Sequence, residues 1–375
     1  MGFLLTFLMV YGLANVYIGN RFFYWLQTLV TVPLIFYWGV FILVAVAPIL
    51  SRILAWVGIA KAENLFFIGD WWLAVTYWSV LLWLIVDITR TFDKLLNFLP
   101  AIAKDISNQG YVVLFILLGM LAYGAWNALN PVITRYDISI DKKTEGIDQL
   151  KIVLVSDIHM GRVVGMDRVE RLAKSLNELN PDIVLYAGDQ IDDDATYVEN
   201  NKIAEPLRNV KARFGSYAVL GNHEYISGQP ALAVSLLKNN GITVLQDQWA
   251  TIGDVIYIVG RDDLSAVRYD ARGTGTLADI MKDIDKNKTI ILMDHQPSRI
   301  NEAAQEGVDL QVSGHTHNGQ FFPNNLITKR IYEQDWGYLK KGTYQLIVSC
   351  GYGTWGPPIR LGNRPEIVEI NIIFN

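Results

Sequence analysis

Four long apolar stretches before residue 131 restrict the possible folds of this chain more than any other feature. Each approaches or exceeds the roughly 20 residues that a helix needs to cross about 30 Å of hydrocarbon, and they cover residues 2–19, 27–50, 65–87 and 111–129. Residues 31–50 contain no charged side chain, and tryptophan and tyrosine crowd the ends of the stretches, as at membrane interfaces. The pattern predicts a bundle of about four transmembrane helices.

Two details bear on the topology of this region. The first stretch has neither a basic start nor an A-x-A-like cleavage site, so we expect it to remain as a helix rather than to be removed as a signal peptide. Residues 91–108 have apolar side chains near helical spacing, which fits a helix on the membrane surface or a simple loop. The basic residues of the loops favour, by about one charge, a C-terminal domain outside the cytoplasm of a multi-pass protein of the cell membrane.

The composition changes at residue 131. Apolar residues make up 51 % of the chain, and the surplus lies before this position. We therefore predict a transmembrane helical region over residues 1–130 and a second domain over residues 131–375. The net charge of −5 argues against a nucleic-acid partner. The single cysteine, Cys350, excludes an internal disulfide, and its apolar surroundings predict a buried side chain.

Strand-like and helix-like patterns alternate in the second domain, beginning with a strand over residues 133–140 that leaves no flexible tether. Further strands are predicted at residues 151–156, 182–187, 217–220, 242–245, 255–259, 289–293, 308–312, 344–349 and 367–373. Helices are predicted at residues 166–179, 200–211, 229–239, 276–285 and 298–306. This order is typical of an α/β domain with helices packed outside largely parallel strands.

Potential metal ligands follow five of the predicted strands, where ligand sites of open α/β sheets gather. The segments are Asp157-Ile158-His159, Gly188-Asp189-Gln190-Ile191-Asp192, Gly221-Asn222-His223-Glu224, Asp294-His295 and Gly314-His315-Thr316-His317. A single histidine is usually structural, but all five histidines of the chain lie in these segments. Mixed oxygen and imidazole ligands suit Mn, Fe or Zn better than Ca. We therefore predict two divalent metal ions that activate a bridging hydroxide for attack at phosphorus.

The order D-x-H, G-D-x-x-D, G-N-H-E, a later single histidine and G-H-x-H resembles the calcineurin-like metallophosphoesterase superfamily over about residues 150–365. The run from Ser313 to Gln320 and the later Trp355-Gly356-Pro357-Pro358 resemble its bacterial branch with an N-terminal membrane region, the transmembrane metallophosphoesterases. The resemblance implies a four-layer α/β/β/α sandwich and seven metal ligands. These are Asp157, His159 and His317 for one ion, Asn222, His295 and His315 for the other, and Asp189 between the two.

The resemblance also implies two roles beside the ligands. His223 would protonate the leaving oxygen or stabilise the developing charge, and Asp192 would orient His223. For the substrate phosphate, Arg360 and Arg162 are candidates, with Arg261 as a competitor, although a surface salt bridge is the favoured interpretation of each arginine. The aromatic residues Trp336, Tyr338, Tyr352 and Trp355 either form a rim for substrate or membrane, or pack in the ordinary way.

The function predicted from these features is hydrolysis of phosphate monoesters, diesters or pyrophosphates, soluble or lipid-linked, by a membrane-anchored enzyme. Two alternatives stay open: a catalytically silent metal-binding sensor or scaffold, and a transporter driven by the second domain. Few charges lie within the apolar stretches, which argues against a transport path. The sequence leaves the ester class, the metal and the oligomeric state open.

Overall fold

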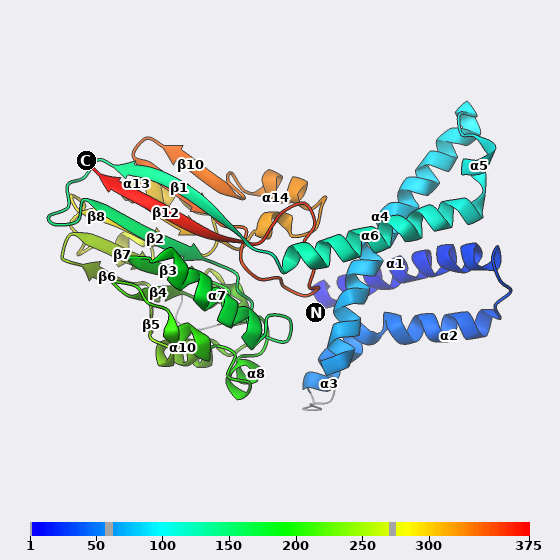
Figure 1. Ribbon diagram of the computed structural model, residues 1–375, viewed down its shortest axis with the longest axis horizontal. Helices are drawn as coiled ribbons and strands as arrows, with labels where there is room; N and C mark the ends of the chain where they lie inside the picture. The colour runs from blue at the N-terminus through cyan, green and yellow to red at the C-terminus, as the bar shows by residue number, and fades with distance from the viewer. Residues whose placement is uncertain (1, 57–62, 270–274) are drawn as a thin grey trace. The chain divides into compact units, whose positions relative to one another are not determined.

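The computed structural model describes residues 2–56, 63–269 and 275–375, and it divides into two compact units (Figure 1). Unit 1 comprises Met1–Trp126 and Gly356–Ile359, and unit 2 comprises Asn127–Trp355 and Arg360–Asn375. Unit 1 is helical and unit 2 contains all the strands that are described. Each unit is treated below by itself.

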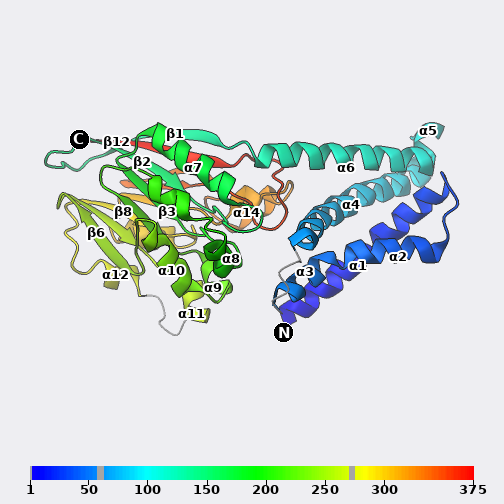
Figure 2. The ribbon, with the colours of Figure 1, turned by 60° about the horizontal axis from the view of Figure 1, so that its bottom comes forward.

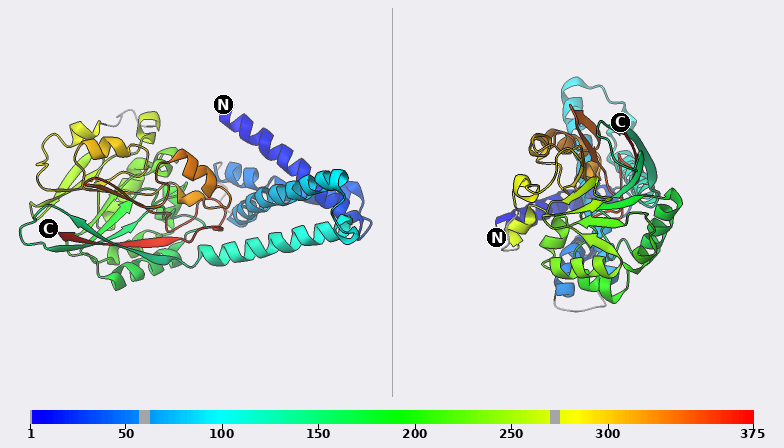
Figure 3. Two further views of the ribbon diagram at one scale, coloured as in Figure 1. Left: turned by 90° about the horizontal axis from the view of Figure 1, so that it is seen from above. Right: turned by 90° about the vertical axis from the view of Figure 1, so that its left-hand side faces the viewer.

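Unit 1 is built from the apolar stretches (Figure 3). Its helices are α1 (Gly2–Gln27), α2 (Leu34–Ala45), α3 (Ala47–Trp56), α4 (Glu63–Leu96), α5 (Ala101–Lys104) and α6 (Ile106–Ala128). Among the described residues, Leu65–Leu96 and Ile106–Ala128 are long and apolar enough to cross a membrane. Helices α2 and α3 form a third candidate span if the pair, bent by 46°, counts as one.

The structure therefore supports two to three spans where the sequence predicts about four. Helix α1 forms over the first predicted stretch, and a further span there stays a prediction. Between α2 and α3, Pro48 has no amide hydrogen with which to continue the helical ladder, which explains the bend. Half of the segment predicted as a surface helix or a loop belongs to longer helices, because α4 continues to Leu96 and α6 begins at Ile106, and the short helix α5 lies between them.

Unit 2 contains two six-stranded mixed sheets. The first has the order β1 (Val132–Ile140), β12 (Glu366–Phe374), β2 (Gln149–Val155), β3 (Ile183–Ala187), β4 (Ser216–Val219) and β5 (Ile242–Val244). The second has the order β10 (Gly337–Lys341), β11 (Tyr344–Val348), β9 (Leu310–Ser313), β8 (Thr289–Met293), β7 (Ile256–Gly260) and β6 (Gln248–Ile252). Strands β2 to β5 run parallel, as do β7, β8, β9 and β11.

Three apolar cores join these sheets and their helices into four layers (Figure 2). One core packs helices α7 (Met166–Leu179) and α10 (Pro230–Asn239) against the first sheet. A second core fills the space between the sheets, and the third packs α12 (Leu277–Ile280) and α13 (Ile300–Gln305) against the second sheet. Strands β3, β7, β8 and β11 are buried along their whole length, which explains why they are continuous apolar runs in the sequence.

Short helices occupy the connections of unit 2. They are α8 (Ala195–Asn200), the 3-10 helix η2 (Glu205–Asn209), α9 (Asn222–Ile226), α11 (Ser265–Tyr269), the 3-10 helix η3 (His317–Gly319) and α14 (Asn325–Ile331). The helix predicted over residues 200–211 is thus only a short 3-10 turn after the end of α8. Helices α8, α9 and α14 lie at the same end of the sheets, where the parallel strands deliver their carboxyl ends (Figures 1 and 2).

Candidate metal centre

The loops after β2, β3, β4, β8 and β9 meet at one edge of the two sheets and bring together the predicted ligands. The ligand atoms of Asp157, His159 and His317 lie within 4.8 Å of one another. Those of Asp189, His295 and His315 form a second group of the same size. Asn222 joins the second group, because its Oδ1 lies 3.3 Å from His295 Nε2. All seven residues predicted as ligands are therefore placed in two adjoining clusters.

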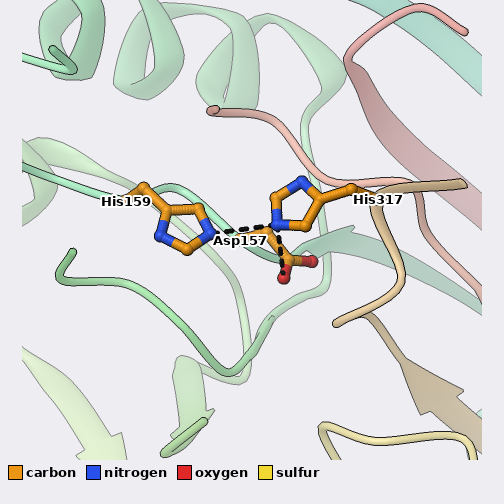
Figure 4. Close-up of side chains that lie close together, drawn as sticks. All are labelled: Asp157, His159 and His317. Atoms are coloured by element: carbon orange, nitrogen blue, oxygen red, sulfur yellow. Dashed lines mark hydrogen bonds and ion pairs between the residues drawn. The ribbon is translucent and has the colours of Figure 1, made fainter. Parts of the chain in front are cut away.

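In the first cluster, hydrogen bonds fix which ring atoms face the site (Figure 4). His159 Nδ1 lies 3.2 Å from Asp192 Oδ1, and a carboxylate only accepts, so Nδ1 carries a proton. His159 Nε2 consequently presents a lone pair to His317 Nε2, 3.0 Å away. Asp157 Oδ1 lies 3.4 Å from the same atom of His317. Two imidazole nitrogens and one carboxylate oxygen thus converge on one point.

The second cluster is oriented in the same way. His295 Nδ1 donates to the carbonyl oxygen of Ala187 at 2.8 Å, which turns Nε2 toward Asp189 Oδ2 at 3.1 Å. The other oxygen of Asp189 accepts from the backbone amide of His223 at 2.9 Å. Such outer contacts are typical of metal-binding histidines, because they set the ring orientation before the ion arrives.

The charges of the site show that these residues fit metal ions. Burial raises the pKa of Asp157, so this carboxylate lacks full compensation. Burial alone would lower the pKa of His295, but Asp189 and Asp157 outweigh it and raise that pKa well above its usual value. Burial and the nearby His295 lower the pKa of His315 to about 4, which keeps it neutral, as a metal ligand must be. The pocket favours added positive charge, and divalent ions would provide it.

Backbone geometry at the ligands is unusual. Five of them adopt left-handed φ values between 50° and 72°: Asp157, His159, Asp189, His315 and His317. This region is sparsely populated by residues other than glycine, and it is retained where the surrounding structure enforces it. Backbone hydrogen bonds do so here, for example from Asp157 N to Gly188 O and from His159 N to Asp189 O, both at 3.0 Å. No sequence pattern predicts this feature.

Two glycines of the motifs lie so close to the ligand carboxylates that a side chain would not fit at either position. A Cβ atom on Gly221 would lie 2.1 Å from Asp189 Oδ1, and one on Gly314 would lie 2.4 Å from Asp157 Oδ2. Both distances are far below contact, so only glycine lets these loops pass beside the ligand carboxylates. The glycines of G-N-H-E and G-H-x-H therefore keep the ligand loops packed together.

Asp192 holds two histidines at once. Its Oδ1 lies 3.2 Å from Nδ1 of His159 and 3.2 Å from Nδ1 of His223, and its backbone oxygen lies 3.0 Å from the same atom of His223. These three residues are also compact enough to hold an ion, but the Nδ1 atoms of both rings already donate to oxygens of Asp192. The link from Asp192 to His159 was not predicted from the sequence. Burial lowers the pKa of His223, yet Asp189 and Asp192 outweigh it and raise that pKa to about 10.

A cavity of about 570 Å³ opens onto the site. Asp189, Asn222, His223, His315 and His317 line it. Apolar residues in its lining are Ile327 and Ile331 of α14, Tyr332 and Trp355. Sequence reasoning missed α14, because a helix of seven residues is too short to show a clear period.

The arginine candidates lie elsewhere in unit 2. Arg360 is fully buried and donates from Nε and Nη2 to Gly353 O and from Nη1 to Asn363 Oδ1. Its Nη2 also lies 3.0 Å from His317 Nδ1, so it contacts a ligand from behind and does not line the cavity. This position argues against the predicted contact with substrate and favours positioning of His317.

Arg162 and Arg261 are engaged in ion pairs, as the simpler interpretation of each arginine had it. Arg162 pairs with Asp194 at 3.3 Å and lies over the ring of Tyr197. Arg261 pairs with Glu302 at 2.7 Å. Neither arginine lines the cavity. The substrate role of Arg162 stays a prediction.

Of the four aromatic candidates, only Trp355 lines the cavity. Tyr352 is buried and donates to Arg168 O, Trp336 donates to Glu366, and Tyr338 donates to Gln345. Tyr352 therefore packs in the core, whereas Trp336 and Tyr338 are 43 % and 37 % exposed, and a rim role for these two stays a prediction. Cys350 is buried, as predicted.

Comparison with known proteins agrees with this site. The family pattern described as calcineurin-like phosphoesterase matches residues 150–319. An uncharacterized metallophosphoesterase of Aquifex aeolicus is 35 % identical over 69 % of this chain and 98 % of its own length. The chain belongs to the calcineurin-like metallophosphoesterases. It is thus a metal-dependent phosphoesterase, and its family uses a dinuclear site of divalent ions.

Two further relatives of this metallophosphoesterase extend the comparison. A metallophosphoesterase of Campylobacter jejuni, named as uncharacterized, is 30 % identical over 97 % of this chain and 96 % of its own length. A Danio rerio protein named transmembrane protein with metallophosphoesterase domain is 33 % identical over 72 % of this chain. The match spans 64 % of the length of the Danio rerio protein. The relatives and the apolar helices together indicate membrane association.

Proposed function

We propose that this metallophosphoesterase hydrolyses phosphate monoester, diester or pyrophosphate bonds at the paired clusters. The observation that carries the proposal is the convergence of two sets of carboxylate, amide and imidazole ligands, with His159 and His295 each oriented by a partner on Nδ1. The chemistry that two divalent ions supply in such a site is activation of a bridging hydroxide and neutralisation of charge at phosphorus. In the overall reaction, water adds to phosphorus and the alcohol or phosphate of the broken bond leaves with a proton.

The proposed ligands are those predicted from the sequence. Asp157, His159 and His317 would hold one ion, Asn222, His295 and His315 would hold the other, and Asp189 would be shared by the two. The support for this assignment is the spacing within each cluster and the burial of both carboxylates.

His223 is the proposed proton donor to the leaving oxygen. Its Nδ1 is tied to Asp192, and its side chain lines the cavity, so the ring can direct Nε2 toward a bound ester. Asp192 holds the ring in this orientation, and through His159 it also supports the first cluster.

For the N-terminal region, we propose that the four apolar stretches anchor a multi-pass protein in the cell membrane, with the boundary near residue 130. The basic residues of the loops support an extracytoplasmic C-terminal domain. A reporter fused after Asn375 tests the orientation. Alkaline phosphatase, which folds only outside the cytoplasm, should be active there, whereas fluorescence of a cytoplasmic reporter at the same position would refute the proposed side.

The enzymatic proposal is tested on the purified full-length protein loaded with Mn²⁺, Fe²⁺ or Zn²⁺. Its hydrolysis of 4-nitrophenyl phosphate, bis(4-nitrophenyl) phosphate and a pyrophosphate ester is compared with that of Asp189→Asn and His223→Gln. Both variants should lose at least about 100-fold in turnover. Asp254→Asn is the matched control, because Asp254 is an exposed turn residue and its loss should change little. Unchanged turnover in both site variants would refute the proposal and favour a sensor or scaffold.

A further inference from the structure

Helix α14 contributes Ile327, Thr328 and Ile331 to the lining of the cavity that also holds the metal clusters. This helix leaves large apolar side chains in contact with solvent: Ile327 is 57 % exposed and Ile331 is 66 % exposed. The two residues are one helical turn apart, so they lie on one face. Both line the same cavity as His223 and the ligands of the clusters.

Trp355 extends this apolar wall. Its side chain is 52 % exposed, while its backbone is held by the buried Gln320, which donates to Trp355 O at 3.1 Å and accepts from Trp355 N at 3.3 Å. The backbone is therefore fixed although the indole ring remains open to the cavity. We call the side chains of Ile327, Ile331, Tyr332 and Trp355 the apolar wall.

The apolar wall is tied directly to the ligand loop. Thr328 of α14 donates to Asp335 Oδ2 at 2.7 Å. Thr316, which lies between His315 and His317, donates to the backbone oxygen of the same Asp335. One residue thus joins α14 to the G-H-x-H segment, so the wall and the ligands keep a fixed separation.

The lining of the cavity discriminates between classes of phosphoester. Among the described residues that line it, none is lysine or arginine. A nucleotide or polyphosphate carries several charges and is usually met by such side chains. Single exposed apolar residues need no explanation, but a cavity lined by both metal ligands and isoleucines suits a ligand with a phosphate head and an apolar body.

We infer that this cavity binds an amphiphilic phosphoester, with the phosphate at the metal clusters and a hydrocarbon chain along Ile327, Ile331 and Trp355. This inference rests on the proposed function and adds a substrate class to it. The candidate membrane spans of unit 1 agree with such a substrate, because a protein held in a bilayer is surrounded by phosphoesters of this kind.

A series of 4-nitrophenyl alkyl phosphates, from ethyl to dodecyl and below their micelle concentrations, tests the inference. The metal-loaded full-length protein is held in phosphatidylcholine nanodiscs, so that no detergent competes for the cavity. We expect kcat/KM to rise about two- to fourfold for each added methylene until the alkyl chain is longer than the apolar wall. A vesicle-embedded long-chain ester forms a second arm, which distinguishes a substrate taken from a bilayer from one taken from solution.

The variants Ile327→Ser and Ile331→Ser should flatten this dependence of kcat/KM on chain length. Ile373→Ser is the matched control: Ile373 is an isoleucine on β12 with 48 % exposure, and it does not line the cavity. Because all three side chains are exposed, the variants should fold.

Binding provides a readout without turnover. Calorimetric titration with alkylphosphonates of increasing length should give tighter binding to the parent protein and to Ile373→Ser, but not to the two α14 variants. A flat dependence on chain length in the parent, the same slope in all variants, or a higher kcat/KM for a nucleotide would overturn the inference while leaving the proposed function intact. Absence of metal-dependent hydrolysis of every ester would instead refute the proposed function.

Discussion

Replacing Asp192 by asparagine tests the role of the carboxylate that orients the histidines and leaves all the predicted metal ligands unchanged. Oδ1 of Asp192 accepts a hydrogen bond from His159 Nδ1 at 3.2 Å and forms an ion pair with His223 Nδ1 at 3.2 Å, while His223 Nδ1 donates to the backbone oxygen of Asp192 at 3.0 Å. Asparagine keeps the size of the side chain, but only one of its two polar atoms accepts. Its NH2 group would meet a ring N–H, or the single remaining oxygen would have to serve both rings without a full charge.

The expected loss follows from these contacts. The side chain of Asp192 is 17 % exposed, so its bonds are only partly screened by water. A hydrogen bond to a charged group contributes about 1.5–3 kcal/mol, and about 1.4 kcal/mol corresponds to a factor of ten. We expect Asp192→Asn to weaken metal binding through His159 and to lower kcat through His223, with a combined loss of about 10- to 100-fold, as is usual for residues that orient metal ligands.

The assay combines a metal titration of the purified protein with steady-state hydrolysis of an aryl phosphate at saturating Mn²⁺. Asp193→Asn is the matched control, because Asp193 is the adjacent acidic residue, is 51 % exposed and pairs with Arg162 at 3.8 Å. An exposed pair of this kind contributes about 0–1 kcal/mol, so the control should change activity by less than about fivefold. Equal losses in both variants, or unchanged metal affinity and kcat in Asp192→Asn, would refute the reasoning.

Three further predictions concern the same domain. Removal of metal by a chelator should abolish hydrolysis and lower the midpoint of thermal unfolding, and added Mn²⁺ should restore both. An unfolding midpoint that does not change with the chelator would contradict metal binding at the two clusters. Gly314→Ala forces a Cβ atom against Asp157 Oδ2 and should destabilise the protein by about 1–3 kcal/mol. Gly165→Ala is the control, because there is open space around its Cβ position, and it should not destabilise the protein. Thermal unfolding of the two variants measures the difference. Burial raises the pKa of the Cys350 thiol, so little thiolate forms in the folded protein between pH 7 and 9, and Cys350 should react with Ellman's reagent only after unfolding.

Elements with a clear period or a long buried run were predicted well from the sequence. Strand β8 spans residues 289–293 as predicted, and α7 spans residues 166–179 as predicted. In α7, apolar residues recur every three or four positions, and Asn180 ends the helix in the left-handed conformation. Burial of one face or of both faces of an element sets the spacing of its apolar residues in the sequence, which explains why these elements were predicted correctly.

Short elements were not predicted, because their stability comes from partners distant in the chain. Strand β10 exists through its pairing with β11, and β6 through its pairing with β7. Helix α14 turns its apolar face to a cavity rather than to a core, so its pattern is that of neither a buried helix nor a loop. In unit 1, the length and apolar character of α4 and α6 are sufficient for a span, whereas a span over α1 stays a prediction.

The sequence alone determined which residue types meet at the site and in what order, since each ligand follows a strand whose apolar run is visible locally. The sequence alone did not determine the side-chain orientations that allow these residues to bind metal ions. Only the tertiary structure decided which nitrogen of His159 and His295 faces the clusters, that Asp192 serves two histidines, and that Arg360 lies behind His317 rather than in the cavity. The physical reason is that periodicity records burial, whereas hydrogen-bond direction depends on groups that lie far apart in the chain, as His159 and His317 do.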